Sequence, residues 1–222
     1  MGKVRGRTAG AVLALALGTA AQAAPPDAVD AMVTASPDGE VLHVGGVIGP
    51  RFEADIRKAL RRHRGTRALV IDSPGGLRAQ AFKVARLVNA RGLTVRVERR
   101  CASACVLLWA QARSREMAPG ARLGLHRSSL ETALPIPAAL RAELMRRNDR
   151  DTDAVLRQAG FPERIVALGA ATPPTTMHWF AADELQREGV PFALLEAGPS
   201  PAQPIAANAA AGSEAGAAAH AP

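Results

Sequence analysis

Two residues of this chain have the types needed for nucleophilic catalysis, a serine at a turn and a histidine after it. Ser103 lies among small residues in the segment Cys101–Cys105, where a strand-to-helix turn could expose its hydroxyl. His126 follows 23 residues later, directly after an apolar segment, and imidazole is well suited to accept a hydroxyl proton near neutral pH. Each has an ordinary alternative role, because serine is also a favoured helix N-cap and a histidine on an apolar strand is usually a hydrogen-bonded core residue.

A second turn, Ser73-Pro74-Gly75-Gly76, could supply the complementary electrophilic groups. Two glycines at the start of a helix allow the backbone to approach a ligand closely and to aim N–H groups at an anion, assisted by the helix dipole. Taken alone, Pro-Gly-Gly is equally typical of a plain tight turn.

Strands alternate with helices around both turns, which predicts an α/β fold with parallel strands. In such folds ligands bind beyond the carboxyl ends of the strands, where both turns fall. The strands are expected at 41–47, 67–72, 93–97, 122–126 and 191–195, and the helices at 52–63, 78–90, 104–113, 138–159 and 163–170, with a last one from 182 to about 189.

The Ser-Pro-Gly-Gly turn, the serine among small residues and the histidine after Leu-Gly-Leu occur in an order that resembles the Clp protease proteolytic subunit and crotonase-like superfamily, over about residues 41–195. More closely, the chain resembles secreted ClpP-like proteins of bacterial envelopes, which have two cysteines flanking the serine. The resemblance implies an α/β, ClpP/crotonase-like spiral of repeated β-β-α units in one domain. It also implies that Ser103 is the nucleophile, that His126 is the general base, and that the N–H groups of Gly76 and Ala104 form an oxyanion hole.

The chain departs from the Clp pattern at the third catalytic position. Clp peptidases have an aspartate that orients the histidine, and Met177 stands at the matching place in the segment 175–180. The neighbouring Thr176 or His178 would stabilise an imidazolium less than a carboxylate does. Three acids could substitute only if the fold brings them close to His126: Asp72, Asp183 and Glu184.

Two functional hypotheses therefore stay open. One is a serine hydrolase, in particular a peptidase, that uses a dyad of Ser103 and His126 with a missing or non-standard third member. The other is a catalytically degenerate ClpP-like scaffold that binds peptides or partner proteins. A crotonase-type acyl-CoA enzyme is disfavoured, because CoA is not expected outside the cytoplasm.

Cys101 and Cys105 are the two cysteines of the chain, and export would make a disulfide between them the default expectation. Side chains four positions apart on a regular helix have Cβ atoms about 5–6 Å apart, which is too far for a disulfide. If the bond forms, Cys101 must therefore precede the helix. Two free buried thiols are the alternative.

The ends of the chain differ from the middle. Residues 1–23 combine three cations, an apolar segment and Ala21-Gln22-Ala23, which is the pattern of a cleaved secretory signal peptide. We expect a lead-in at 24–39, the ClpP-like domain at 40–196 and a disordered tail rich in Ala and Pro at 197–222. The expected location is the periplasm, with no membrane span after signal cleavage.

Composition and charge exclude other classes. Aromatic residues make up 3% of the chain, too few for stacking surfaces that bind single-stranded nucleic acid. The net charge of +8 falls to +5 when Lys3, Arg5 and Arg7 leave with the signal peptide, which further weakens a nucleic-acid function. The other histidines show no spacing that suits metal ligands, and they are His43, His63, His178 and His220. No metal or other cofactor is therefore expected.

The expected partner is a peptide or protein substrate. An ATPase partner is not expected, because ATP is scarce outside the cytoplasm. By resemblance to Clp peptidases, the helix at 138–159 could mediate self-association into a homo-oligomer.

Overall fold

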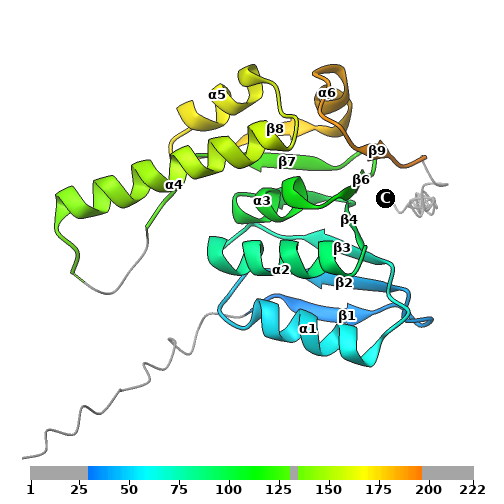
Figure 1. Cartoon of the computed structure of the whole chain (residues 1–222). Helices are drawn as coiled ribbons and strands as arrows, with labels where there is room; N and C mark the ends of the chain where they lie inside the picture. Colours follow the sequence, from blue (N-terminus) through cyan, green and yellow to red (C-terminus); the bar gives the residue numbers. More distant parts are fainter. Residues whose placement is uncertain (1–29, 131–134, 197–222) are drawn as a thin grey trace, which may run out of the picture.

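The computed structural model describes residues 30–130 and 135–196. The expected signal peptide, residues 24–29 of the lead-in and the tail lie outside these residues. The larger sheet has six strands in the order β1-β2-β3-β4-β6-β9, with β1 antiparallel to β2 and the other neighbours parallel (Figure 1). Its strands are β1 (Met32–Ala35), β2 (Val41–Gly45), β3 (Ala68–Asp72), β4 (Thr94–Val97), β6 (Ser114–Met117) and β9 (Ala193–Leu194).

A smaller sheet carries the two candidate catalytic segments. β5 (Arg100–Ala102) pairs in parallel with β7 (Arg122–Leu125), and β7 pairs antiparallel with β8 (His178–Ala181). A parallel bridge between Ser73 and Cys101 connects the end of β3 to β5. The smaller sheet therefore continues from the larger one at the point where both candidate turns occur.

The helices stack in chain order beside the sheets (Figure 1). Each of the first four contacts the next along the chain, so that strands and helices advance together as a spiral of repeated units. The helices are α1 (Phe52–Arg62), α2 (Arg78–Ala90), α3 (Ala104–Gln111), α4 (Ala138–Gln158), α5 (Glu163–Ala171) and α6 (Ala182–Arg187).

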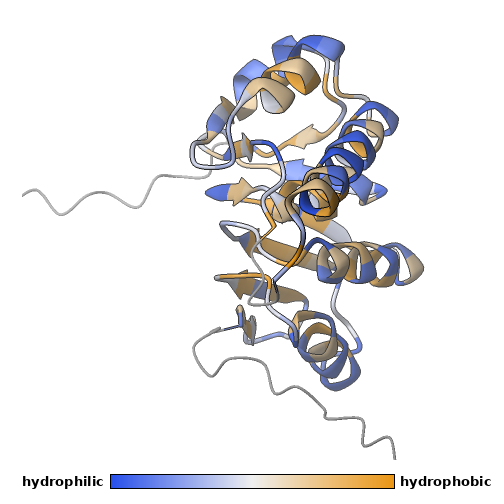
Figure 2. Ribbon diagram, turned by 90° about the vertical axis from the view of Figure 1, so that its left-hand side faces the viewer, coloured by the Kyte–Doolittle hydropathy of each residue, from blue (hydrophilic) through white to orange (hydrophobic). Residues whose placement is uncertain are grey.

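Burial follows the sequence pattern closely in the first half of the domain. Phe52, Ile56 and Leu60 on α1 are all buried, as apolar residues four positions apart on one helix face should be. Figure 2 shows that the helices carry both hydrophobic and hydrophilic residues. α3 is different, because every residue from Ala104 to Ala110 is buried. A helix that is apolar all round belongs in the centre of a domain, and α3 lies between α2 and α4.

Four strands were not anticipated from the sequence: β1, β5, β6 and β8. β1 falls within the segment 24–39 that we expected to lead into the domain, so the sheet begins earlier than expected. β6 has the polar sequence Ser-Arg-Glu-Met, and its pairing with β4 includes a hydrogen-bonded ion pair between Glu116 and Arg96 at 2.8 Å. No helix within the described ranges combines the length and the apolar character needed to cross a bilayer.

Candidate active site

The two candidate turns lie directly against each other. Ser73 N–H donates to the carbonyl of Arg100, and Ala102 N–H donates to the carbonyl of Ser73, each at 3.0 Å. These bonds hold the start of the Ser-Pro-Gly-Gly turn beside the residue that precedes Ser103. Ser73 and Ser103 are 30 positions apart in the sequence, and the sheet brings their backbones together.

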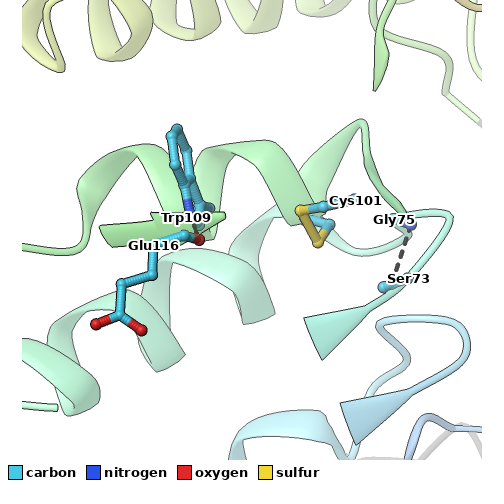
Figure 3. The surroundings of a disulfide bond; sticks show 6 residues. Ser73, Gly75, Cys101, Trp109 and Glu116 are labelled. Atoms are coloured by element: carbon cyan, nitrogen blue, oxygen red, sulfur yellow. Dashed lines mark hydrogen bonds between the residues drawn. A yellow bond between two sulfur atoms is a disulfide. The ribbon is translucent and has the colours of Figure 1, made fainter. Parts of the chain in front are cut away.

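Gly75 has no room for a side chain. Its φ is +101°, and a Cβ at this position would lie 2.7 Å from the Ala102 oxygen and 2.8 Å from the Ser103 Cβ. Its N–H donates to Ser73 Oγ at 3.1 Å, which fixes the turn (Figure 3). The glycine is therefore required by the close approach of this turn to Ser103.

Ser103 occupies a strained position between β5 and α3. Its φ of 53° and ψ of −123° make it, within the described residues, the one non-glycine residue with positive φ. Its side chain makes no cap hydrogen bond to α3, which argues against the ordinary N-cap role. Strain of this kind at a strand-to-helix turn is typical of a nucleophile whose hydroxyl must project from the backbone.

A disulfide between Cys101 and Cys105 spans this turn, with Cα atoms 5.3 Å apart (Figure 3). Cys101 belongs to β5 and Cys105 to the first turn of α3, so the bond forms because the first cysteine precedes the helix, as expected. Both cysteines are fully buried. The covalent link ties the last strand residues before Ser103 to the helix that follows it.

The N–H groups assigned to an oxyanion hole lie on the two facing turns. The backbone bonds to Ile48 come from the residues that flank Gly76, because Ile48 N–H donates to Gly75 and Leu77 N–H donates to Ile48, each at 2.7 Å. The Gly76 N–H takes no part in these two hydrogen bonds to Ile48, and the residue is exposed. Ala104 is the first residue of α3, where N–H groups have no partner within the helix.

His126 follows β7, on the strand adjacent to β5. The register pairs Ala102 with Gly124, and Ser103 N–H donates to the carbonyl of Gly124 at 2.9 Å. β5 and β7 therefore end side by side, and the residues that directly follow them are Ser103 and His126. No hydrogen bond joins Ser103 Oγ to the imidazole within the described ranges, and catalytic contacts of this kind commonly tighten only when substrate binds.

Burial lowers the pKa of His126, while the Arg127 carbonyl and the charge of Asp149 oppose this shift. The imidazole is half-buried, and its Nδ1 is buried without a hydrogen-bond partner among the residues that the structure describes. A lowered pKa keeps the imidazole neutral at pH 7, which is the form that accepts a proton.

The position of the Clp aspartate holds no acid. A Cβ added at Gly124 would lie 2.8 Å from Cγ and Sδ of Met177, so the thioether packs over β7 close to the segment that carries His126. The neighbouring Thr176 hydroxyl donates to the Pro173 carbonyl at 3.3 Å, and the His178 ring packs against Phe180.

The three acids considered as substitutes are engaged elsewhere. Asp72 pairs with Arg99 at 3.0 Å, and Asp183 pairs with Arg187 at 2.7 Å. Glu184 lies 4.0 Å from the guanidinium of Arg164. The acid whose charge acts on His126 is Asp149 on α4, a residue that the sequence did not single out, because it stands in a helix rich in charged residues with no motif around it.

No cluster of three or more His, Cys, Asp or Glu side chains able to hold a metal ion occurs in the part of the chain that the structure describes.

The strand order, the helices stacked in sequence and the serine between β5 and α3 define a single-domain α/β fold of the ClpP type. Among solved structures, a mutant ClpP1 from Listeria monocytogenes is similar, with a TM-score of 0.57 and 18% sequence identity. The match covers 72% of this chain and 93% of that chain. No family model and no curated protein matches the sequence.

Proposed function

We propose that this protein is a secreted ClpP-like serine hydrolase that cleaves peptide bonds through an acyl-enzyme on Ser103. The observation that carries the proposal is the conformation of Ser103, held at positive φ between a strand and a buried helix, with the glycine turn packed against it. A structural serine at this place would have no need of strain, whereas a nucleophile gains an exposed hydroxyl from it.

In the proposed reaction Ser103 Oγ attacks the carbonyl carbon while His126 accepts the hydroxyl proton. The tetrahedral oxyanion accepts hydrogen bonds from Gly76 and Ala104 N–H, and each such donor is worth about 2.7–4 kcal/mol in comparable hydrolases. The intermediate collapses, the C–N bond breaks, and the amine leaves with the proton from His126. Water then attacks the acyl-enzyme with His126 again as base, which releases the carboxylic acid and restores the serine.

Export of the chain belongs to the same proposal. The pattern of residues 1–23 predicts a signal peptide, and the disulfide at the nucleophile turn is of the kind that persists in oxidising compartments. We place the protein in the periplasm, where it acts without an ATP-driven unfoldase. Its substrates are then expected to be peptides or unstructured segments that need no unfolding.

Self-association is also part of the proposal, and α4 is the element that supports it. This helix has 21 residues, and the only one of them that is buried is Leu156 near its end. Leu140 and Leu144 are 51% and 37% exposed. An apolar stripe on a projecting helix is a suitable contact between copies of the chain. Light scattering of the mature protein, compared with a Leu140→Glu/Leu144→Glu variant, tests this directly.

The rival function is a ClpP-like scaffold that binds peptides without cleaving them. The observation in its favour is the missing hydrogen bond between Ser103 Oγ and His126 within the described residues.

The two functions are distinguished by turnover, because a hydrolase cleaves its substrate and a scaffold only binds it. Purified mature protein should hydrolyse activated esters and a mixed peptide library, and Ser103→Ala and His126→Ala should each abolish this activity. Ser114→Ala, which changes an exposed serine on β6, is the matched control and should leave it unchanged. Peptide binding without any turnover would favour the scaffold.

A further inference from the structure

α4 is attached to both sides of the candidate site by neighbouring residues. Arg78, at the start of α2 and two residues after Gly76, donates to Asn148 Oδ1 at 2.8 Å and lies 3.5 Å from Asp151. On the other side, Ser128 N–H donates to Asp149 Oδ1 at 2.7 Å. Ser128 is two residues after His126, so this bond fixes the Asp149 carboxylate beside the catalytic histidine.

Asp149 and His126 line the same small pocket between β7, α4 and α5. The pocket offers about 10 Å³ to the centre of a water molecule, which is close to the space that a single bound water needs. One water in this pocket can accept the His126 Nδ1 proton in a hydrogen bond and donate to the carboxylate. Asp149 Oδ1 accepts the Ser128 N–H, and Oδ2 makes no hydrogen bond within the described residues.

His126 Nδ1 is the group that such a partner would satisfy. It is buried and has no hydrogen-bond partner in the described part of the chain, and leaving a buried polar atom unpaired is costly. In serine hydrolases the nitrogen of the histidine that points away from the serine donates to an acid, which selects the tautomer and stabilises the imidazolium. His126 shares its pocket with Asp149, and pairing the buried Nδ1 on that side leaves Nε2 to act on Ser103.

We propose that Asp149 on α4 is the positioning acid of this site, and that it orients His126 in place of the acid missing at Met177. The inference rests on the proposed hydrolase function. The third member of the site has then moved from the segment before β8 to a different element, where the Ser128 N–H and the α2 to α4 contacts hold it.

Asp153, one turn further along α4, lines the same pocket and is the natural competitor. Burial raises the pKa of Asp153, so it holds its negative charge less readily than an ordinary aspartate does. The negative charge that raises the pKa of His126 is that of Asp149 and not that of Asp153. The other charged group of the pocket is Arg127, and α5 contributes no titratable side chain to it.

The test compares Asp149→Asn with Asp153→Asn. Asparagine retains an oxygen that can accept the Ser128 N–H, so the first variant removes the charge and keeps the anchor. The His126 imidazole is titrated by NMR in a Ser103→Ala background, with His126→Gln to assign its signals. We expect Asp149→Asn to lower the pKa of His126 by about 0.5 or more, since an opposite charge favours the imidazolium, and Asp153→Asn to change it less.

The second readout is the rate at which a fluorophosphonate reacts with Ser103. Asp149→Asn should slow it about tenfold or more, toward the loss of about 10⁴ seen when a triad aspartate is neutralised, and Asp149→Glu, which restores the charge, should recover part of it. An unchanged His126 pKa in Asp149→Asn, or an equal change in Asp153→Asn, would overturn the assignment of Asp149. If the wild type does not react but the pKa shift occurs, the hydrolase function fails while the coupling of Asp149 to His126 stands.

Discussion

The disulfide between Cys101 and Cys105 should contribute about 2 kcal/mol to stability and should hold Ser103 in its strained conformation. The cysteines are four positions apart, so the bond closes a short loop, and the entropy of closing such a loop in the unfolded chain corresponds to about 2 kcal/mol at 25 °C. A non-glycine residue at positive φ costs about 1–3 kcal/mol. The two quantities are similar, so the bond is sufficient to offset the strain at Ser103.

Reduction removes this support without changing any side-chain volume. Urea unfolding of the wild type with excess phosphine should give a free energy of unfolding about 2 kcal/mol lower than without it. The reaction of Ser103 with a fluorophosphonate should slow by about 10²-fold, because a displacement of the nucleophile by about 1 Å costs that much. The variant Cys101→Ala/Cys105→Ala is the matched control, and reductant should not alter its stability or its reactivity.

Equal unfolding midpoints for the oxidised and the reduced wild type would refute the stability estimate. Equal labelling rates would refute the idea that the bond holds the nucleophile in place. A loss of stability with unchanged labelling would mean that the sheet and the glycine turn alone impose the conformation of Ser103.

Three further predictions follow from glycine contacts and from the histidine. Gly75→Ala should lower the free energy of unfolding by about 2–4 kcal/mol, from positive φ and from steric clash, whereas Gly120→Ala, with open space around it, should change it little in the same urea titration. Labelling of Ser103 should rise with pH through a midpoint below about 6.5, the usual pKa of histidine, because burial lowers the pKa of His126 and only the neutral base is active; a midpoint above this usual value would contradict the expectation. Gly124→Ala should lower the free energy of unfolding by about 1–3 kcal/mol, because the new methyl group contacts the Met177 thioether. Adding Met177→Ala should recover part of this loss, and strictly additive effects of the two substitutions would show that the two side chains do not touch.

The elements with strong apolar periodicity could be predicted from the sequence. α1 is an example, since its buried residues follow the helical period and do not depend on what packs against them. β6 could not be predicted, because Ser-Arg-Glu-Met has no apolar alternation and becomes a strand through its neighbours β4 and β9. β5, with three residues, is too short to give any pattern and exists because β7 pairs with it.

The candidate site also has residues that the sequence indicates and residues that only the fold brings into it. Ser103 and the glycine turn stood out because small residues at helix starts are locally unusual, and the resemblance to Clp peptidases related them to His126. Their actual proximity depends on the bridge between Ser73 and Cys101, which pairs residues far apart in the chain. Asp149 gave no signal, because it is one of many charged residues on α4, and its place in the pocket beside His126 and its hydrogen bond from Ser128 N–H depend on the fold.

The most direct test of the central claim is to map the covalent adduct that a fluorophosphonate forms with the purified mature protein at neutral pH. Peptide mass spectrometry should place one adduct per chain on Ser103 and none on Ser73, the other serine at the two facing turns. Ser103→Ala should remain unmodified, and His126→Ala should react far more slowly. An unmodified wild type under both oxidising and reducing conditions, or an adduct that persists in Ser103→Ala, would contradict the claim that this turn carries a catalytic nucleophile.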